Sequence, residues 1–182
     1  PEVSTVMVWK KYPSELHVAL TMDPLVALVC LGEPEETEAT LAGTGSFVQE
    51  YPPYQYLTSR GVYLEEPFPL GENGEEKLRI HIVDWAVKPV HRQRLVDPDL
   101  LSDIARVRQV LEESFGHTVT FVTLYIRARE FHVQTEKLSL WFDRALPLVQ
   151  QFEHYRAFLR TIPPGSTEQY VDLRLHDRVV YR

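Results

Sequence analysis

The sequence has very little cysteine, and this excludes several kinds of site. Cys30 is the only cysteine among 182 residues. A single cysteine cannot form an intrachain disulfide or a zinc site based on cysteine pairs. Cys30 lies within an apolar run, where a cysteine usually packs as a small hydrophobic side chain. A chain of this length can bury enough apolar surface to hold a core without such cross-links.

Long apolar runs and an excess of positive charge are also missing. The longest apolar run, Leu25–Leu31, has the length of a strand and is far too short to span a bilayer. There are 19 Lys and Arg against 26 Asp and Glu, a net charge of −7, which disfavours a nucleic-acid binder because such proteins need a basic surface. No signal peptide is evident, and the first residue is Pro1, so we expect any anchor to lie in a segment absent from this chain.

The motifs of common catalytic and metal sites do not occur. The seven histidines lack metal-ligand spacing, and there is no H-E-x-x-H motif. The eight glycines form neither a dinucleotide-binding loop nor a P-loop, and there is no G-x-S-x-G elbow. We therefore predict no catalytic residue, no metal and no cofactor, and a protein that is not an enzyme.

The first part of the chain shows the period-two alternation that is typical of strands. Residues 3–9 and 16–21 predict a hairpin around a turn at 10–14, followed by a strand over 25–31. The stretch from Gly32 to Gly45 lacks apolar periodicity and predicts an exposed loop. Further strands are predicted from Val62 and over residues 78–82.

The second part of the chain adds two helices. Asp97, Pro98 and Gly116 predict the start and end of a helix with an apolar stripe from Leu100 to Phe115. A second helix is predicted to begin at a capping Asp143, to stop before Pro163, and to carry five apolar positions: Leu148, Phe152, Tyr155, Leu159 and Ile162. Strands are predicted over residues 119–126, 131–133, 138–142, 170–175 and 178–182. The whole predicts an α+β fold: a small strand-rich N-terminal segment, then a largely antiparallel sheet with two helices on one face.

The strand predicted from Tyr170 to Leu175 follows the second helix, near the end of this chain. A last strand often lies at a sheet edge, where backbone N–H and C=O groups are unpaired. A partner strand can add to such an edge through main-chain hydrogen bonds. The alternative is an ordinary protected edge, and the residues alone leave both possibilities open.

The segment Tyr170–Arg174 (YVDLR) resembles the signature that closes the β domain of the bacterial cell-division protein family FtsQ, called DivIB in Gram-positive bacteria. Other segments are similar to that family in the same order along the chain: Val3–Ala27 to the end of its POTRA domain, Ser59–Leu64 to one strand, Leu100–Phe115 to a helix, and Arg129–Val133 with Lys137–Phe142 to paired strands before a helix at 144–162. The resemblance is collinear over nearly the whole chain.

This resemblance implies two units and a function. Residues 1–31 would be a partial POTRA-like segment, and residues 32–182 an FtsQ-type β domain. The protein would be a non-enzymatic divisome scaffold on the extracytoplasmic face of the bacterial inner membrane, at the division septum. It would bind FtsB-like and FtsL-like coiled-coil proteins and so couple to septal peptidoglycan synthesis.

The resemblance also implies the binding residues. The partner would add a strand at the closing edge, where Arg174 would pair with an acidic residue and the added strand would be flanked by Leu175, Asp177, Val179 and Tyr181. Two other classes remain as alternatives: a POTRA-type module of a secretion or outer-membrane assembly machine, and a small enzyme with a site built from non-motif residues.

Overall fold

The α+β class is confirmed by the computed structural model, in which two helices accompany a two-stranded N-terminal sheet and a nine-stranded mixed sheet. The structure describes residues 2–11, 15–32, 35–37, 48–50, 54–67, 77–85, 87–163 and 169–182. The tip of the predicted first turn, at 12–14, lies outside the described residues, as does most of the predicted loop at 32–45. A third small sheet pairs β4 (Glu35–Thr37) with β5 (Val48–Glu50), so the prediction of an unstructured loop is wrong at residues 35–37.

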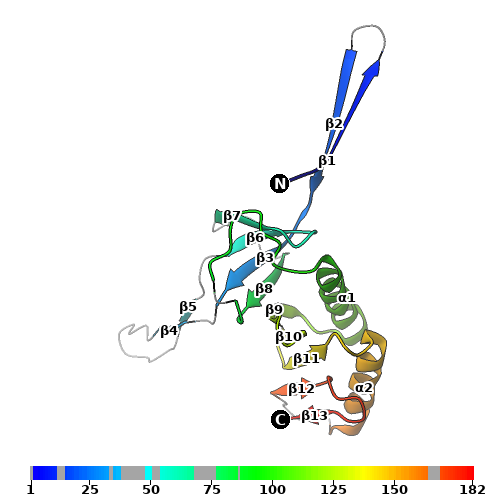
Figure 1. Ribbon diagram of the computed structural model, residues 1–182. Coiled ribbons are helices and arrows are strands. Elements are labelled where there is room, and N and C mark those ends of the chain that lie inside the picture. The colour runs from blue at the N-terminus through cyan, green and yellow to red at the C-terminus, as the bar shows by residue number, and fades with distance from the viewer. Residues whose placement is uncertain are drawn as a thin grey trace.

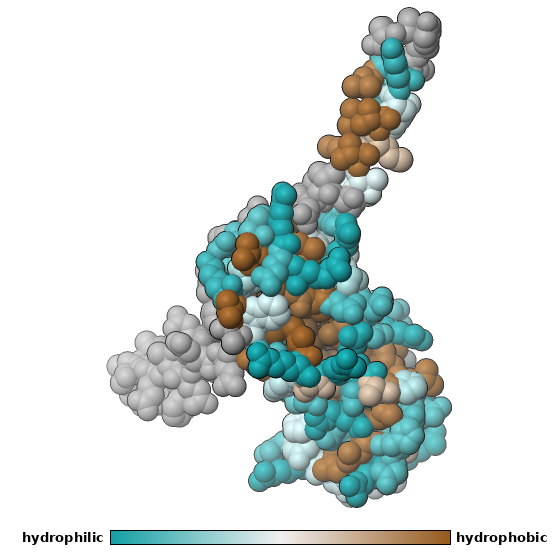
Figure 2. Space-filling model, in the orientation of Figure 1, coloured by the Kyte–Doolittle hydropathy of each residue, from teal (hydrophilic) through white to brown (hydrophobic). Residues whose placement is uncertain are grey.

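The predicted N-terminal hairpin is present and extends away from the large sheet (Figure 1). It pairs β1 (Glu2–Lys11) with β2 (Glu15–Asp23) in antiparallel register, with Val8 opposite Val18. Because opposed residues in such a pair share a face, one face is almost wholly aliphatic. Its members, each between 54% and 67% exposed, are Val6, Val8, Leu16, Val18 and Leu20. These apolar side chains form the brown band along the hairpin in Figure 2.

The large sheet has the strand order β13-β12-β11-β10-β9-β8-β3-β6-β7. Its strands are β3 (Leu25–Leu31), β6 (Gln55–Thr58), β7 (Tyr63–Pro67), β8 (Leu78–Ile82), β9 (Val119–Tyr125), β10 (Glu130–Thr135), β11 (Ser139–Asp143), β12 (Tyr170–Asp172) and β13 (Val180–Tyr181). Five of the eight pairings are antiparallel, and the pairings β3–β8, β8–β9 and β11–β12 are parallel. Long connections allow these parallel pairs: α1 lies between β8 and β9, α2 lies between β11 and β12, and the strands β4 to β7 lie between β3 and β8.

The first helix, α1 (Pro98–Phe115), follows the prediction from its start to its end. The carboxylate of Asp97 accepts a hydrogen bond from the backbone N–H of Asp99 at 2.9 Å. At the other end, Gly116 has φ +65°, a left-handed conformation that glycine adopts without strain. The apolar stripe is buried along its length, with Ile104 and Leu111 fully inaccessible.

The second helix, α2 (Leu148–Thr161), starts later than predicted. Asp143 does not cap it, because Asp143 ends β11 and its carboxylate accepts a hydrogen bond from the backbone of Ala145. Pro147 occupies the N-cap position instead. Phe158, rather than the predicted Leu159, faces the core, and Leu159 is 38% exposed.

Both helices pack on the same face of the large sheet (Figure 1). The core forms between them and the inward side chains of the strands, with Val122, Phe131 and Phe142 essentially inaccessible. The opposite face of the sheet carries no helix among the described residues. Neither described helix has the length and apolar character needed to cross a bilayer.

Candidate functional site

The two outer strands of the large sheet, β7 and β13, differ in whether other residues of the chain cover their outer edges. Residues 91–96 run along β7 and the turn before it. Tyr63 donates its N–H to the carbonyl of Gln93 at 2.9 Å and accepts from the N–H of Arg92 at 2.8 Å. Leu95 donates to the carbonyl of Gly61 at 2.9 Å. This edge is therefore satisfied within the chain and is closed to a further strand.

Side chains strengthen the cover over β7. The N–H of Glu65 donates to Nδ1 of His91 at 3.1 Å, and the Glu65 carboxylate pairs with Lys88 at 2.5 Å. The salt bridge lowers the pKa of Glu65 from its ordinary value, chiefly through the hydrogen bond from Lys88. Lys88 and His91 therefore both contribute to the protection of this edge.

The β13 edge, in contrast, is open. Arg182 exchanges backbone hydrogen bonds with Tyr170, and Val180 lies opposite Asp172. Backbone polar groups point to alternate sides along a strand, so those of Val179 and Tyr181 point away from β12. No described residue provides a backbone partner for them. This end of the sheet therefore offers donors and acceptors that a further strand can use.

The side chains of this edge form an apolar face and a polar face. Tyr181 lies opposite the buried Val171, and its ring contacts that of Phe158 on α2 with centroids 5.0 Å apart. Val179 packs partly against the core. On the other face, Val180 is 39% exposed and Arg182 is exposed. Tyr181 remains 52% exposed, so much of its ring is available to a neighbour.

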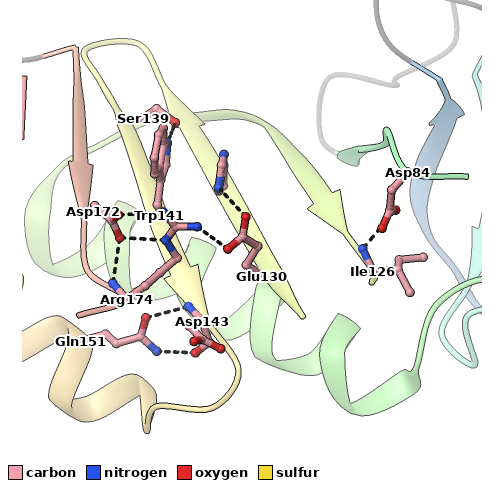
Figure 3. A network of polar contacts seen from close by, with 10 residues as sticks. Asp84, Ile126, Glu130, Ser139, Trp141, Asp143, Gln151, Asp172 and Arg174 are labelled. Carbon is pink, nitrogen blue, oxygen red and sulfur yellow. Dashed lines mark hydrogen bonds and ion pairs between the residues drawn. The ribbon is translucent and has the colours of Figure 1, made fainter. Parts of the chain in front are cut away.

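Arg174 lies just after β12 and is engaged within the chain (Figure 3). Its Nε and Nη2 donate to the two carboxylate oxygens of Asp172 at 2.9 and 2.7 Å, and its Nη1 pairs with Glu130 of β10. Its backbone N–H also donates to Asp172, and its guanidinium lies 4.9 Å from the ring centroid of Trp141. The group is therefore held by three side chains from three strands.

The charges in this cluster stabilise one another. The hydrogen bonds that Arg174 donates to Asp172 raise the pKa of Arg174 above its ordinary value against the opposing effect of burial, and Glu130 adds to the rise. Burial by itself would raise the pKa of Asp172, but the hydrogen bonds and charge of Arg174 bring it below the ordinary value. Bidentate pairs of this kind are among the stronger hydrogen bonds in proteins.

A row of four neighbouring rings runs across the helix-free face beside this cluster; two of its three contacts are stacked, and the contact of Tyr125 with His132 is tilted. Tyr125, His132, Trp141 and Tyr170 come from β9, β10, β11 and β12, and neighbouring centroids lie 4.4 to 4.7 Å apart. Burial and the nearby Arg174 lower the pKa of His132 to about 4. At neutral pH His132 is therefore an uncharged member of the row, which links the four strands on this face.

The predicted binding residues lie in three different environments in the structure. Val179 and Tyr181 lie at the open edge, while Leu175 and the exposed Asp177 lie in the connection between β12 and β13. Arg174 lies apart from them in its internal cluster. The sequence did not predict Glu130 and Trp141 as its partners. The available signal was that Glu130 directly precedes one predicted strand and that Trp141 alternates with Leu140 and Phe142 in the next.

A site for small-molecule chemistry finds little support among the described residues. No group of three His, Cys, Asp or Glu side chains in this part of the chain is arranged to hold a metal ion. A hollow of about 430 Å³ beside β3 and β7 has two charged lining residues, Glu65 and Lys88, which pair with each other. Its remaining lining is mostly apolar, including Val29, Leu31 and Trp85.

Comparisons with known proteins place no further constraint on this site. No model of a known protein family matches the sequence, and a search of curated proteins finds no significant match.

Proposed function

We propose that this protein is a non-enzymatic scaffold of the FtsQ type, which binds a partner by strand addition at β13. The observation that carries the proposal is the difference between the two sheet edges. Residues 91–96 close β7, whereas Val179 and Tyr181 direct unpaired backbone groups outward from β13. Folded proteins normally protect such an edge or use it.

The order of elements supports the same proposal. The YVDLR segment supplies β12 and the start of the connection to β13, so the motif that resembles the family's signature lies beside the open edge. The preceding strands, β10 and β11, are paired and lead into α2. We therefore propose an FtsB–FtsL-like coiled-coil pair as the partner, at the extracytoplasmic face of the bacterial inner membrane.

The hairpin supports a second part of the proposal. A two-stranded ribbon is only marginally stable in water by itself, yet β1 and β2 expose five aliphatic side chains on one face. We propose that the hairpin of β1 and β2 belongs to a POTRA-like unit, in which further elements cover this face. Residues 25–31, which the predicted segment 1–31 included, form β3 of the large sheet. Two contacts fix the junction between the hairpin and the large sheet. Nη1 of Arg60 lies 3.8 Å from Oδ2 of the buried Asp23, and the N–H of Ser59 donates to the carbonyl of Pro24.

Calorimetric titration of this chain with the extracytoplasmic FtsB–FtsL-like pair from the same genome tests the proposal. The informative comparison is Tyr181→Pro against Tyr181→Ala. Both remove the ring, but only proline also removes the outward N–H, and it leaves the bonds between β13 and β12 in place. We expect saturable binding by the native chain and at least an additional fivefold loss for proline, the equivalent of about one hydrogen bond.

Two results would count against strand addition. One is an absence of binding by a chain whose circular dichroism shows that it is folded. The other is equal affinity for the proline and alanine variants, which would mean that the outward N–H is not used. A variant at the covered edge, Glu65→Ala, serves as the control and is expected to bind like the native chain.

A further inference from the structure

We propose that the strand that adds to β13 alternates apolar and acidic side chains, and that its carboxylates pair with Arg178 and Arg182 rather than with Arg174. This inference rests on the strand-addition site of the proposed function and specifies the chemistry of its partner. It follows from what each face of β13 presents and from which arginines are already engaged.

On the side of the sheet that the helices cover, the β13 edge favours apolar side chains in the added strand. An added strand continues the alternation of the sheet, so every second residue would lie beside Tyr181 and Val179. Tyr181 is half exposed and rests on Phe158, while Val179 packs partly against the core. An apolar neighbour would bury more of the Tyr181 ring, and a charged neighbour would lose hydration at that position.

The opposite face calls for negative charge. Arg182 shares this face with Val180. Arg178 lies two residues before Val180, just before β13, and extending the same alternation would place it on this face as well. Both arginines are exposed, and no carboxylate of the described residues lies within ion-pair distance of either. Without the engaged Arg174, residues 175–182 contain two arginines and one aspartate, a formal charge of +1 in a chain whose total is −7.

Arg174 is a poor receptor for the carboxylate of a partner. Its guanidinium already bonds two acids, Asp172 and Glu130, so the cluster as a whole carries a net charge of −1. A third carboxylate would face like charges in a partly buried position, since the side chain of Arg174 is only 23% exposed. The favourable positions for added negative charge are therefore on β13 and just before it.

The same charges disfavour a second copy of this chain as the occupant. Antiparallel pairing of two β13 strands would place the arginines of both copies on one face of the joined sheets. Like charges across paired strands are destabilising, whereas opposite charges contribute about 0.2 to 1 kcal/mol for each pair. An acidic strand from a different protein satisfies the edge without this repulsion.

The test uses two short synthetic peptides with blocked ends, one alternating Val and Glu and the other alternating Val and Lys. Each is titrated into the isotopically labelled full chain at low ionic strength, and binding is followed by NMR through the backbone amides. We expect the Val-Glu peptide to shift the amides of Val179 and Tyr181 and to bind about tenfold more tightly than the Val-Lys peptide. Added salt should reduce this difference.

Charge reversal identifies the arginines responsible. The double variant Arg178→Glu/Arg182→Glu should prefer the Val-Lys peptide. The matched control is Arg174→Met, checked for folding by its amide spectrum, which should keep the native preference for Val-Glu. Equal binding of both peptides by the native chain would overturn the inference. So would an unchanged preference in the double variant, or no shift with either peptide at millimolar concentration.

These outcomes are separable from those of the proposed function. If the Val-Glu peptide binds at β13 but the FtsB–FtsL-like pair does not bind, the charge rule stands and the proposed partner is wrong. If the pair binds and Tyr181→Pro weakens it, while the peptides show no charge preference, the strand-addition function stands and this inference is wrong.

Discussion

Gln151 and Asp143 form a reciprocal pair of hydrogen bonds that joins the start of α2 to the end of β11. The side-chain amide of Gln151 donates to the backbone carbonyl of Asp143 at 2.7 Å, and its Oε1 accepts from the Asp143 N–H at 3.0 Å (Figure 3). The same amide nitrogen donates to the carbonyl of Leu146 at 2.9 Å. Gln151 is fully buried, so water cannot reach the three backbone groups that its side chain bonds.

Replacing Gln151 with leucine should destabilise the protein by about 2–4 kcal/mol, because three backbone groups would lose their partner at a buried site. The measurement is urea unfolding of the two chains at neutral pH. Gln150→Leu is the matched control on the same turn of α2 and should change the free energy of unfolding by no more than about 0.5 kcal/mol. Similar values for the two variants would mean that the Gln151 bonds contribute little.

Arg174→Met should cost about 1–3 kcal/mol of stability. The substitution keeps much of the aliphatic stem but leaves Asp172 and Glu130 as neighbouring, partly buried acids without their cation. Arg178→Met, at an exposed arginine, should be nearly neutral. Equal unfolding free energies for the two variants would show that the cluster around Arg174 does not stabilise the fold.

Gly61→Ala should be among the most disruptive small substitutions, with a loss of more than about 3 kcal/mol. Gly61 has φ +71°, and an added Cβ would lie 1.8 Å from the carbonyl oxygen of Val96. Gly116 also has a positive φ, of +65°, but nothing lies within 4 Å of its Cβ position. Gly116→Ala should therefore cost only about 1 kcal/mol. Thermal unfolding of both variants separates steric overlap from backbone preference.

Stability should fall as the pH is lowered from about 7 toward 4.5, because three histidines, His81, His132 and His117, have a lower pKa in the folded state than in the unfolded state. Burial lowers the pKa values of His81 and His132 from 6.5 to about 4. The positive charge of Arg79 adds to the effect on His81, and that of Arg174 adds to the effect on His132. The unfolded chain takes up these protons near pH 6.5 and the folded chain does not. The stabilisation is therefore complete above pH 6.5 and is lost between that value and about 4.

The full loss should be on the order of 3 kcal/mol for each of His81 and His132, from about 1.4 kcal/mol for each pKa unit. Urea unfolding across this range measures it as a slope against pH. The double variant His81→Gln/His132→Gln should flatten the slope, whereas His176→Gln, at an exposed histidine, should leave it unchanged. An unaltered slope in the double variant would assign the acid sensitivity to carboxylates instead.

Local patterns predicted the elements whose signals are short in range. The cap at Asp97, the proline after it and Gly116 define α1 because each acts on the helix terminus beside it. The same reasoning failed at Asp143, because a capping side chain can also serve a turn, and the strand pairing of β11 took precedence. Phe158, and not Leu159, lies in the core. The start of α2 was predicted too early, and packing against the sheet determines which face of α2 is buried.

The sequence by itself determined the α+β class, the hairpin of alternating residues and the position of the closing YVDLR segment. Only the tertiary structure decided that residues 91–96 close one edge, that β13 forms the other, and that Arg174 is held by Asp172 and Glu130. The physical reason is range. Periodicity and capping depend on residues within a few positions, whereas strand order and the partners of a charge depend on which distant segments the core brings together.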